Sequence, residues 1–470
     1  MIAKRRYQLI LRIALCLALT AALGAGTGRA VAQPGAAAMA LDECIERALA
    51  QNIQVLIAEE GIRRSEADVR TARANRLPDV NVTAFGYSRS RTGPSVRIQE
   101  NPTDQLDPAT GDRIYQEEVT RIPGVDRNSY SFSASLNQTL YDGGSRGRSS
   151  RAARSSLRGS ERDLESQRQA ITFAVKDRYY SLLQAKEEEV VQSEALALSE
   201  RRLEEARVQL QVGRGTQADV LRLEVALGNA QAAAVNARQA VTLARASLNH
   251  IMGEPISRPL EVAPLPAAEL EPGAALPELS DLVGQATEGN PTVERLRYGV
   301  QAAEDNLAAA RAAWYPRVSG SVSYSRNNEV FDRVYQALDQ NYRLNIGLAL
   351  SYNLFDGGLR SAAIDRSRAS VRTARLTLQQ QERDLTLSVE TGYLEMARLR
   401  ELLQIAARTV ELAKEDLRLA EERYRVGKGR LLEVLDAQVG FTQARQDQVR
   451  LRYDLAAARA DLERLTAGQL

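Results

Sequence analysis

An internal duplication constrains the fold of this chain more than any other feature of the sequence. Residues 52–78 match residues 290–316 at a constant offset of 238 positions, with asparagine at the start and proline at the end of both copies. Residues 141–253 match residues 355–467 at an offset of 214 without a gap, and the difference of 24 residues is extra length between Pro78 and Asp142. A duplication that covers nearly the whole chain predicts two similar structural units.

The N-terminal segment has the pattern of a secretory signal peptide. Basic residues 4–6 precede an apolar stretch at 13–23, and Ala30-Val31-Ala32 offers a small-x-small cleavage site. A membrane anchor is the alternative, but the stretch is shorter than the ~20 residues that a spanning helix needs. The predicted organisation is a signal peptide at 1–32, a first repeat at 33–253, a proline-rich connector at 254–277 and a second repeat at 278–470.

Each repeat is predicted to hold an interrupted helix, two strands, a very long helix and a last helix. The expected helices are 41–76 and 278–315, interrupted near Asn52 and at Asn290-Pro291, then 145–212, 216–252, 359–426 and 430–466. A helix of about 68 residues would be ~100 Å long, which exceeds a globular domain. In the last helices, apolar residues recur at three-four spacing from Val220 to Ile251 and from Val434 to Leu465, which predicts coiled-coil packing.

Apolar and polar residues alternate along 129–141 and 341–354, and less regularly along 79–88 and 317–325. A half-buried soluble sheet would alternate in the same way. Length and aromatic residues at the strand ends favour membrane strands instead, because tilted spans need ~10 residues and aromatic girdles flank them. Four such strands cannot close a barrel, and lipid does not tolerate open sheet edges, so several chains must share one barrel.

Composition excludes several classes of protein. One histidine, His250, and two cysteines exclude multi-histidine and cysteine-rich zinc sites, and 62 basic against 60 acidic residues give no reason to expect a nucleic-acid partner. We predict no cofactor, no resident metal and no enzymatic activity. The enzymatic alternative, a hydrolase using serine and His250, lacks a G-x-S-x-G elbow.

The longer segment of the first repeat, residues 89–128, is rich in proline and charge and is predicted to be a mobile extracellular loop. Its aspartates Asp104, Asp107 and Asp112 could bind a cation, but turn formation is the simpler explanation for them.

Together these features resemble the TolC-type outer-membrane efflux proteins over residues 41–467. The resemblance is carried by the signal peptide, the duplication, Asp-Gly-Gly at 142–144 and 356–358, and Tyr424-Arg425-Val426-Gly427 leading to Val434-Leu435-Asp436. It implies a mainly α fold with a small β part, in which a homotrimer forms a 12-stranded outer-membrane barrel continuous with a periplasmic coiled-coil tunnel. It also implies a passive duct of tripartite efflux or type I secretion, with a periplasmic adaptor and an inner-membrane transporter as partners. A periplasmic coiled-coil adaptor is the alternative, against which the strand pairs argue.

The glycines between the long and last helices are predicted to form tight turns, since glycine accepts the left-handed conformation. They are Gly213, Gly215, Gly427 and Gly429. By resemblance these turns are the periplasmic tip, where an adaptor docks. Asp142 and Asp356 precede the long helices and are predicted to cap them.

By resemblance, Glu433 and Asp436 point into the periplasmic entrance, where three copies would form a ring that favours cations. The alternative is that they only favour the positive end of a helix. Tyr424 and Asp219 resemble positions that link neighbouring helices and hold the entrance shut. The family's gate arginine falls on Gly429, so either Arg430 acts from the next position or that link is absent.

Overall fold

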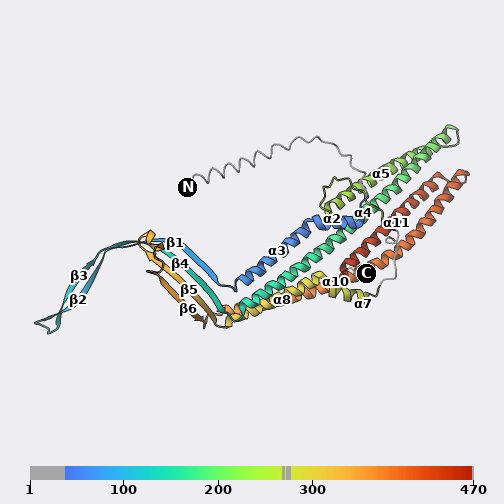
Figure 1. Cartoon of the computed structure of the whole chain (residues 1–470). Coiled ribbons are helices and arrows are strands. Elements are labelled where there is room, and N and C mark those ends of the chain that lie inside the picture. Colours follow the sequence, from blue (N-terminus) through green and yellow to red (C-terminus); the bar gives the residue numbers. More distant parts are fainter. Residues whose placement is uncertain (1–37, 267–269, 271–276, 468–470) are drawn as a thin grey trace, which may run out of the picture.

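The computed structural model describes residues 38–266, 270 and 277–467. The predicted signal peptide and part of the proline-rich connector lie outside these residues. The molecule is elongated, with a β-hairpin at one end, a four-stranded sheet beside it, and long helices that end in two hairpin tips at the far end (Figure 1). In the described ranges, no helix has both the length and the apolar composition needed to cross a membrane.

The interrupted helices lie where the sequence predicts them. They are α2 (Leu41–Gln51) and α3 (Ile53–Ala74) in the first repeat, and α7 (Leu279–Gly289) and α8 (Pro291–Arg311), followed by the short turn η1 (Ala312–Trp314), in the second. The Asn52 side chain accepts a hydrogen bond from Gln54 N at 2.9 Å, and Asn290 accepts one from Thr292 N at 3.0 Å. Both breaks are therefore N-caps that restart a helix.

The long helices are α4 (Ser145–Gln211) and α10 (Leu359–Arg425), and the last helices are α5 (Gln217–Ile251) and α11 (Leu431–Leu465). The three-four positions of α5 and α11 are buried or half-buried against α4 and α10, as predicted. Helix α11 also packs on α4 of the other repeat. That contact buries a second set of residues, which the sequence pattern did not reveal: Gln438, Val449, Tyr453, Ala456 and Ala460.

Four antiparallel strands form the main sheet in the order β1-β4-β5-β6, with β1 and β6 as its edges. The strands are β1 (Asp79–Thr92), β4 (Val125–Tyr141), β5 (Arg317–Asn328) and β6 (Arg343–Ser351), and the short helix α9 (Phe331–Tyr335) precedes β6. Leu136 lies opposite Val80 and Val322, so the apolar residues share one face. The register places serines and asparagines together on the other face, as the alternation predicts.

The prediction of a mobile loop at residues 89–128 is wrong. Strand β1 continues to Thr92, β4 begins at Val125, and between them β2 (Ser95–Leu106) and β3 (Arg113–Ile122) form a separate antiparallel hairpin. This hairpin projects beyond the sheet (Figure 1). Asp107 Oδ1 accepts a hydrogen bond from Ala109 N at 2.9 Å, so this aspartate takes part in the turn of the hairpin.

The largest apolar core lies midway along the helices, where α2, α4, α5, α11 and the connector meet. Tyr179 of α4 is almost fully buried there, and its hydroxyl donates to the carbonyl of Ala263 at 2.7 Å. Val262 of the connector pairs with Met39 in an isolated parallel bridge. The described part of the connector therefore contributes to this core.

Candidate functional site

The two helical hairpins end in turns of the same design. Gly213 has φ +73° and Gly427 has φ +75°, a left-handed conformation that strongly favours glycine. Gly215 and Gly429 are needed for space instead. A Cβ atom on Gly429 would lie 3.0 Å from the backbone nitrogen of Tyr424, and one on Gly215 would lie 3.1 Å from that of Leu210.

At the first tip, Asp219 is engaged by its own helix. Thr216 is the N-cap of α5, and its hydroxyl accepts a hydrogen bond from Asp219 N at 3.2 Å. The same hydroxyl donates to Asp219 Oδ2 at 2.7 Å. The carboxylate also suits the positive end of the helix, so Asp219 has a clear structural role.

At the second tip, the counterparts of Thr216 and Asp219 are Arg430 and Glu433, and the equivalent cap contact is missing. Arg430 is the N-cap of α11 and makes no side-chain cap bond. The side chains of Glu433 and Asp436 are exposed, and within the described residues no hydrogen bond or ion pair reaches either carboxylate. They lie three positions apart, which places them on one side of α11.

Tyr424 lies between the two tips. It packs against an apolar cluster from both hairpins, which includes Leu203, Leu223 and Leu431. Burial raises the pKa of the Tyr424 hydroxyl, and the nearby carboxylates of Asp219 and Glu205 raise it further. The structure thus brings Tyr424 close to Asp219, while Arg430, Glu433 and Asp436 lie on the exposed side of the second tip.

Farther from the tips, a polar clamp that sequence reasoning missed joins the hairpins. Arg202 of α4, whose side chain is only 10 % exposed, pairs with Glu421 of α10 and donates to Gln438 of α11. Gln438 in turn donates to the Ser199 hydroxyl at 3.4 Å. In the sequence, Gln438 stands next to Ala437 of the three-four pattern, and nothing there indicates that its polar side chain is buried.

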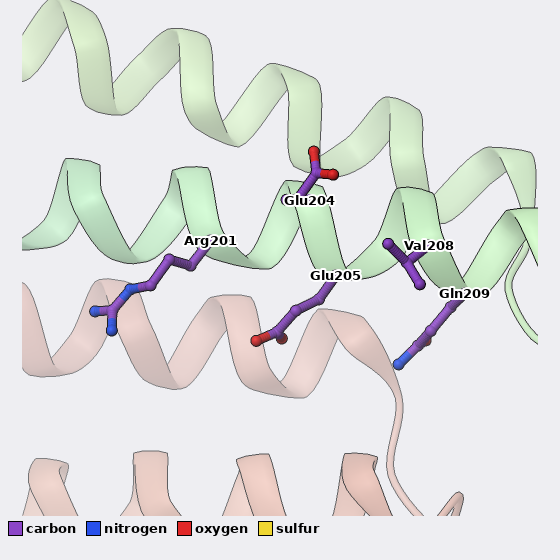
Figure 2. Close-up of a pocket in the computed structure, with 5 residues that line it drawn as sticks. All are labelled: Arg201, Glu204, Glu205, Val208 and Gln209. Atoms are coloured by element: carbon purple, nitrogen blue, oxygen red, sulfur yellow. The ribbon is translucent and has the colours of Figure 1, made fainter.

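A shallow hollow of about 460 Å³ lies along α4 between this clamp and the tip. It is lined by Arg201, Glu204, Glu205, Val208 and Gln209, all from this one helix. In Figure 2, Arg201, Glu205 and Gln209 extend away from α5, and Glu204 extends toward it. The side chains that line the hollow are charged or polar apart from Val208, and they do not converge on a common point, so they form no binding site.

Asp142 and Asp356 have the same geometry at the junction of sheet and helix. Asp142 Oδ1 accepts from Gly144 N at 3.1 Å, and its Oδ2 accepts from Arg146 Nε at 2.7 Å; Asp356 repeats both bonds with Gly358 and Arg360. Burial alone would raise the pKa of the Asp142 carboxyl, but the bonds from Arg146 outweigh it and hold the pKa below its ordinary value. Each aspartate therefore fixes the turn from strand to long helix.

Comparisons with known proteins agree with this architecture. The outer membrane efflux protein BepC of Brucella suis is 26% identical over 400 residues, which cover 81% of this chain and 83% of BepC. The protein CyaE of Bordetella pertussis is 26% identical over 411 residues, covering 87% of this chain and 80% of CyaE. The crystal structure of CusC has the same fold, with a TM-score of 0.76 at 17% identity over 91% of each chain.

The profile of the family described as outer membrane efflux protein matches residues 44–254 and 282–468, one segment in each repeat. This family consists of outer-membrane channels, so neither the adaptor nor the hydrolase alternative is favoured. The chain belongs to the outer membrane efflux protein family and is an efflux or secretion channel of the outer membrane.

Proposed function

We propose that three copies of this chain form a passive exit duct, with a 12-stranded barrel in the outer membrane and a coiled-coil tunnel in the periplasm. The observation that carries the proposal is a four-stranded sheet with two unpaired edges, joined directly to helices of 67 residues. Three such sheets supply twelve strands, and closure removes the edges that lipid does not tolerate. In this proposal residues 1–32 are a cleaved signal, and the repeats at 33–253 and 278–470 are joined by the connector at 254–277.

The exposed face of β6 supports a lipid contact. Ile346 is 76 % exposed, and Leu348 and Leu350 are each 72 % exposed. Asn345 and Gly347 point to the opposite face, where the register aligns them with serines of β5. A surface of this kind is unfavourable in water and suits the hydrocarbon of a bilayer.

The second tip supports an entrance that selects by charge. Three copies would bring six carboxylates together, from Glu433 and Asp436 of each chain. Such a ring attracts cations and repels anions. Tyr424 and Asp219, which lie close together, would hold the hairpins in the closed arrangement. Arg430, which makes no side-chain cap bond to α11, would supply the link to a neighbouring copy.

The partners follow from the same arrangement. The sequence offers no phosphate-binding loop of the GxxxxGK[ST] type, so the energy for export would come from an inner-membrane transporter. The glycine turns at 213–215 and 427–429 are the outermost points of the helical end, where a periplasmic adaptor would dock. BepC, an outer membrane efflux protein, and CyaE both resemble this chain over at least 80% of their own length.

Cysteine labelling tests the membrane strands. Single cysteines at Ile346 and Leu348 should react with lipid-phase probes, and single cysteines at Asn345 and Gly347 should react with aqueous probes. Equal labelling of the two sets would refute the membrane-strand assignment. Native mass measurement in detergent tests the assembly, since a stable monomer would refute the duct.

A further inference from the structure

The long helices carry their excess of positive charge at the end that joins the sheet (Figure 1). In α4, residues 145–160 hold five arginines and no acidic residue, whereas residues 161–211 hold 8 basic and 11 acidic residues. In α10, residues 359–375 hold five arginines and one aspartate, whereas residues 376–425 hold 8 basic and 10 acidic residues. Both repeats therefore have a basic segment beside the sheet.

Each of the four helices that adjoin the sheet has an exposed arginine near it. We name these residues the arginine collar: Arg73 of α3, Arg154 of α4, Arg311 of α8 and Arg368 of α10. Within the described residues, no ion pair or hydrogen bond reaches the side chains of the first three, and Arg368 pairs only with the exposed Asp365 of its own helix. The collar arginines therefore do not hold the helices together.

The contacts of α4 decide which way Arg154 points. Ser160 contacts Ser65 of α3 at 2.8 Å, and Gly159 packs against Tyr298 of α8. Adjacent residues are about 100° apart around a helix, so both neighbours lie toward one side of α4, and Arg154 lies about 120–140° from both contacts. Both neighbours of a helix in a closed ring are displaced toward the lumen. Arg154 therefore lies on the outer surface of the proposed tunnel.

Arg73 lies on the same outer surface. It follows Glu59 of α3 by fourteen residues, which is about four helical turns. Glu59 pairs with Arg168 of α4 at 3.4 Å, and Arg168 follows Arg154 by fourteen residues as well. Arg73 and Arg154 therefore continue the side of the two helices that this ion pair marks.

The other two collar residues are related in the same way. Arg311 follows Glu304 of α8 by seven residues, or about two turns, and Arg368 precedes Arg375 of α10 by seven. Glu304 pairs with Arg375 at 2.6 Å. Arg311 and Arg368 therefore share one side of this second pair of helices.

A third ion pair joins the two pairs of helices on this surface. Arg151, which lies one turn before Arg154 on α4, pairs with Asp305 of α8 at 3.2 Å. Asp305 directly follows Glu304. All four collar arginines therefore face the outside of the proposed tunnel.

The side of the long helices that faces the lumen is neutral at this height. Ser149 and Ser156 of α4 lie on the side between its two neighbours, and their counterparts on α10 are Ala363 and Ser370. A molecule that passes through the tunnel therefore does not meet the collar, and the ligand of the collar has to lie outside the tube.

The collar lies at the depth of lipid headgroups if the sheet spans the membrane. Trp314 and Tyr315 are 50 % and 58 % exposed just before β5, and such aromatic side chains mark the boundary of a bilayer. Arg311 lies three residues before Trp314, and Arg154 lies nine residues, ~14 Å, after the start of α4. A headgroup layer is ~5–8 Å deep, and charges act over a further ~8 Å at physiological ionic strength. The headgroups on the helical side of the membrane are therefore within reach of the collar.

We propose that the arginine collar binds the phosphate groups of anionic phospholipids in the leaflet that adjoins the helices. The inference rests on the proposed position of the sheet in the outer membrane and adds the class of lipid that the chain recognises there. Arginine suits this ligand, because its planar guanidinium donates two parallel hydrogen bonds to a phosphate. Three copies would surround the tube with twelve such arginines.

Native mass spectrometry in a non-ionic detergent tests the lipid preference. The protein receives dioleoylphosphatidylglycerol or dioleoylphosphatidylcholine at equal concentration, and the lipids bound per chain are counted. The parent protein should retain at least roughly fivefold more phosphatidylglycerol, because each arginine near an anionic surface favours binding. Replacing all four collar arginines by glutamine should abolish the preference. Replacing them by lysine should keep part of it, because the charge remains without the paired hydrogen bonds.

The matched control replaces four exposed arginines in the tip-side half by glutamine, namely Arg201, Arg214, Arg408 and Arg425. It removes the same charge and should leave the preference unchanged. Equal losses in the two glutamine variants, or a full preference in the collar variant, would overturn the proposal. Far-ultraviolet circular dichroism checks that the variants stay helical. If the fourfold collar variant unfolds, the four single glutamine variants carry the test, each with a smaller loss.

Inorganic phosphate separates a lipid site from a site for free anions. At the same ionic strength as a chloride control, phosphate should displace no more lipid than chloride does, and selective displacement would overturn the lipid assignment. Lipids are counted per chain, so the result does not depend on the number of copies. A monomer that keeps the preference refutes only the duct, a trimer without it refutes only the collar, and a monomer without it refutes both.

Discussion

The two hairpin tips occupy equivalent positions of the duplication, yet they use their acidic residues differently. Asp219 is bound by Thr216, which caps α5. Its counterpart Glu433 lies three residues after Arg430, the N-cap residue of α11, which makes no side-chain cap bond. The side chains of Glu433 and Asp436 are both exposed to solvent. The helix-end explanation therefore accounts for Asp219, whereas at the second tip no side chain of the described residues binds either carboxylate.

The largest expected effect on ion selectivity separates these two roles directly. Glu433→Ala with Asp436→Ala should lower cation-over-anion permeability in planar bilayers by at least roughly fivefold, since unit charges ~4 Å apart interact by ~1 kcal/mol even in water. Asp219→Ala is the matched control, which should keep the selectivity and raise the conductance. If the double variant keeps full selectivity, both carboxylates serve only the helix end, where each contributes ~0.3–1 kcal/mol.

The next effect concerns the clamp that holds the tips at their relative positions. Arg202→Ala removes hydrogen bonds to Glu421 and Gln438, and bonds to charged groups contribute about 1.5–3 kcal/mol. Amide exchange at residues 203–223 should accelerate roughly tenfold or more, and conductance should rise at unchanged selectivity. Among the described residues, the exposed neighbour Arg201 bonds only to Ala197 O of its own helix, so Arg201→Ala should change neither quantity. Equal effects of both variants would show that the clamp does not join the hairpins.

How much the sequence predicts depends on how periodic each segment is. The helix bounds follow from long three-four patterns and from caps such as Asn52 and Asn290, and the structure confirms them to within a few residues. The hairpin at 95–122 was missed because Pro102 and many charged residues interrupt its alternation. A two-stranded hairpin without a core leaves only a weak pattern.

The tips were predicted in part. Glycine spacing located both turns, because left-handed backbone and close approach leave few other choices. The clamp was missed because Gln438 and Tyr453 lie on a second buried face of α11, and polar side chains hide that face from a hydrophobic pattern. The N-cap residue decides whether the acidic residue is bound by its own helix. Thr216 binds Asp219 at the first tip, and Arg430 makes no side-chain cap bond at the second.

Substitutions at the two N-cap residues, Thr216 and Arg430, test whether the cap decides how each tip uses its acidic residue. Thr216→Ala should destabilise the first turn of α5 by ~1 kcal/mol, measured as roughly fivefold faster amide exchange there. Arg430→Thr should give the second tip a capping box with Glu433 and slow exchange in α11 by a similar factor. It should also reduce cation selectivity, because Glu433 is drawn to its own helix. Arg430→Ala supplies the control without a cap, and identical exchange in these two variants would refute the capping argument.

The smallest expected effect is the pH dependence of the contact at Tyr424. The pKa of its hydroxyl is raised above the ordinary value of 10.0 by burial and by the carboxylates of Asp219 and Glu205. A raised pKa means that the folded tip favours the neutral form of Tyr424, so the stability that this contact contributes is complete below pH 10 and is lost as the pH rises through the folded value. Because a single group loses its proton, the free energy of this contact can fall by at most ~1.4 kcal/mol per pH unit.

Tyr424→Phe should remove this alkaline loosening while leaving amide exchange at neutral pH nearly unchanged. The measurement is amide exchange at the tips from pH 9 to 11 in both proteins. The difference between them removes the contribution of all other tyrosines, which the two proteins share. Tyr115→Phe, on the exposed β2–β3 hairpin, is the control and should follow the parent protein. If Tyr424→Phe loosens as steeply as its parent above pH 10, another group carries the titration, and Tyr424 acts at the tip only through packing.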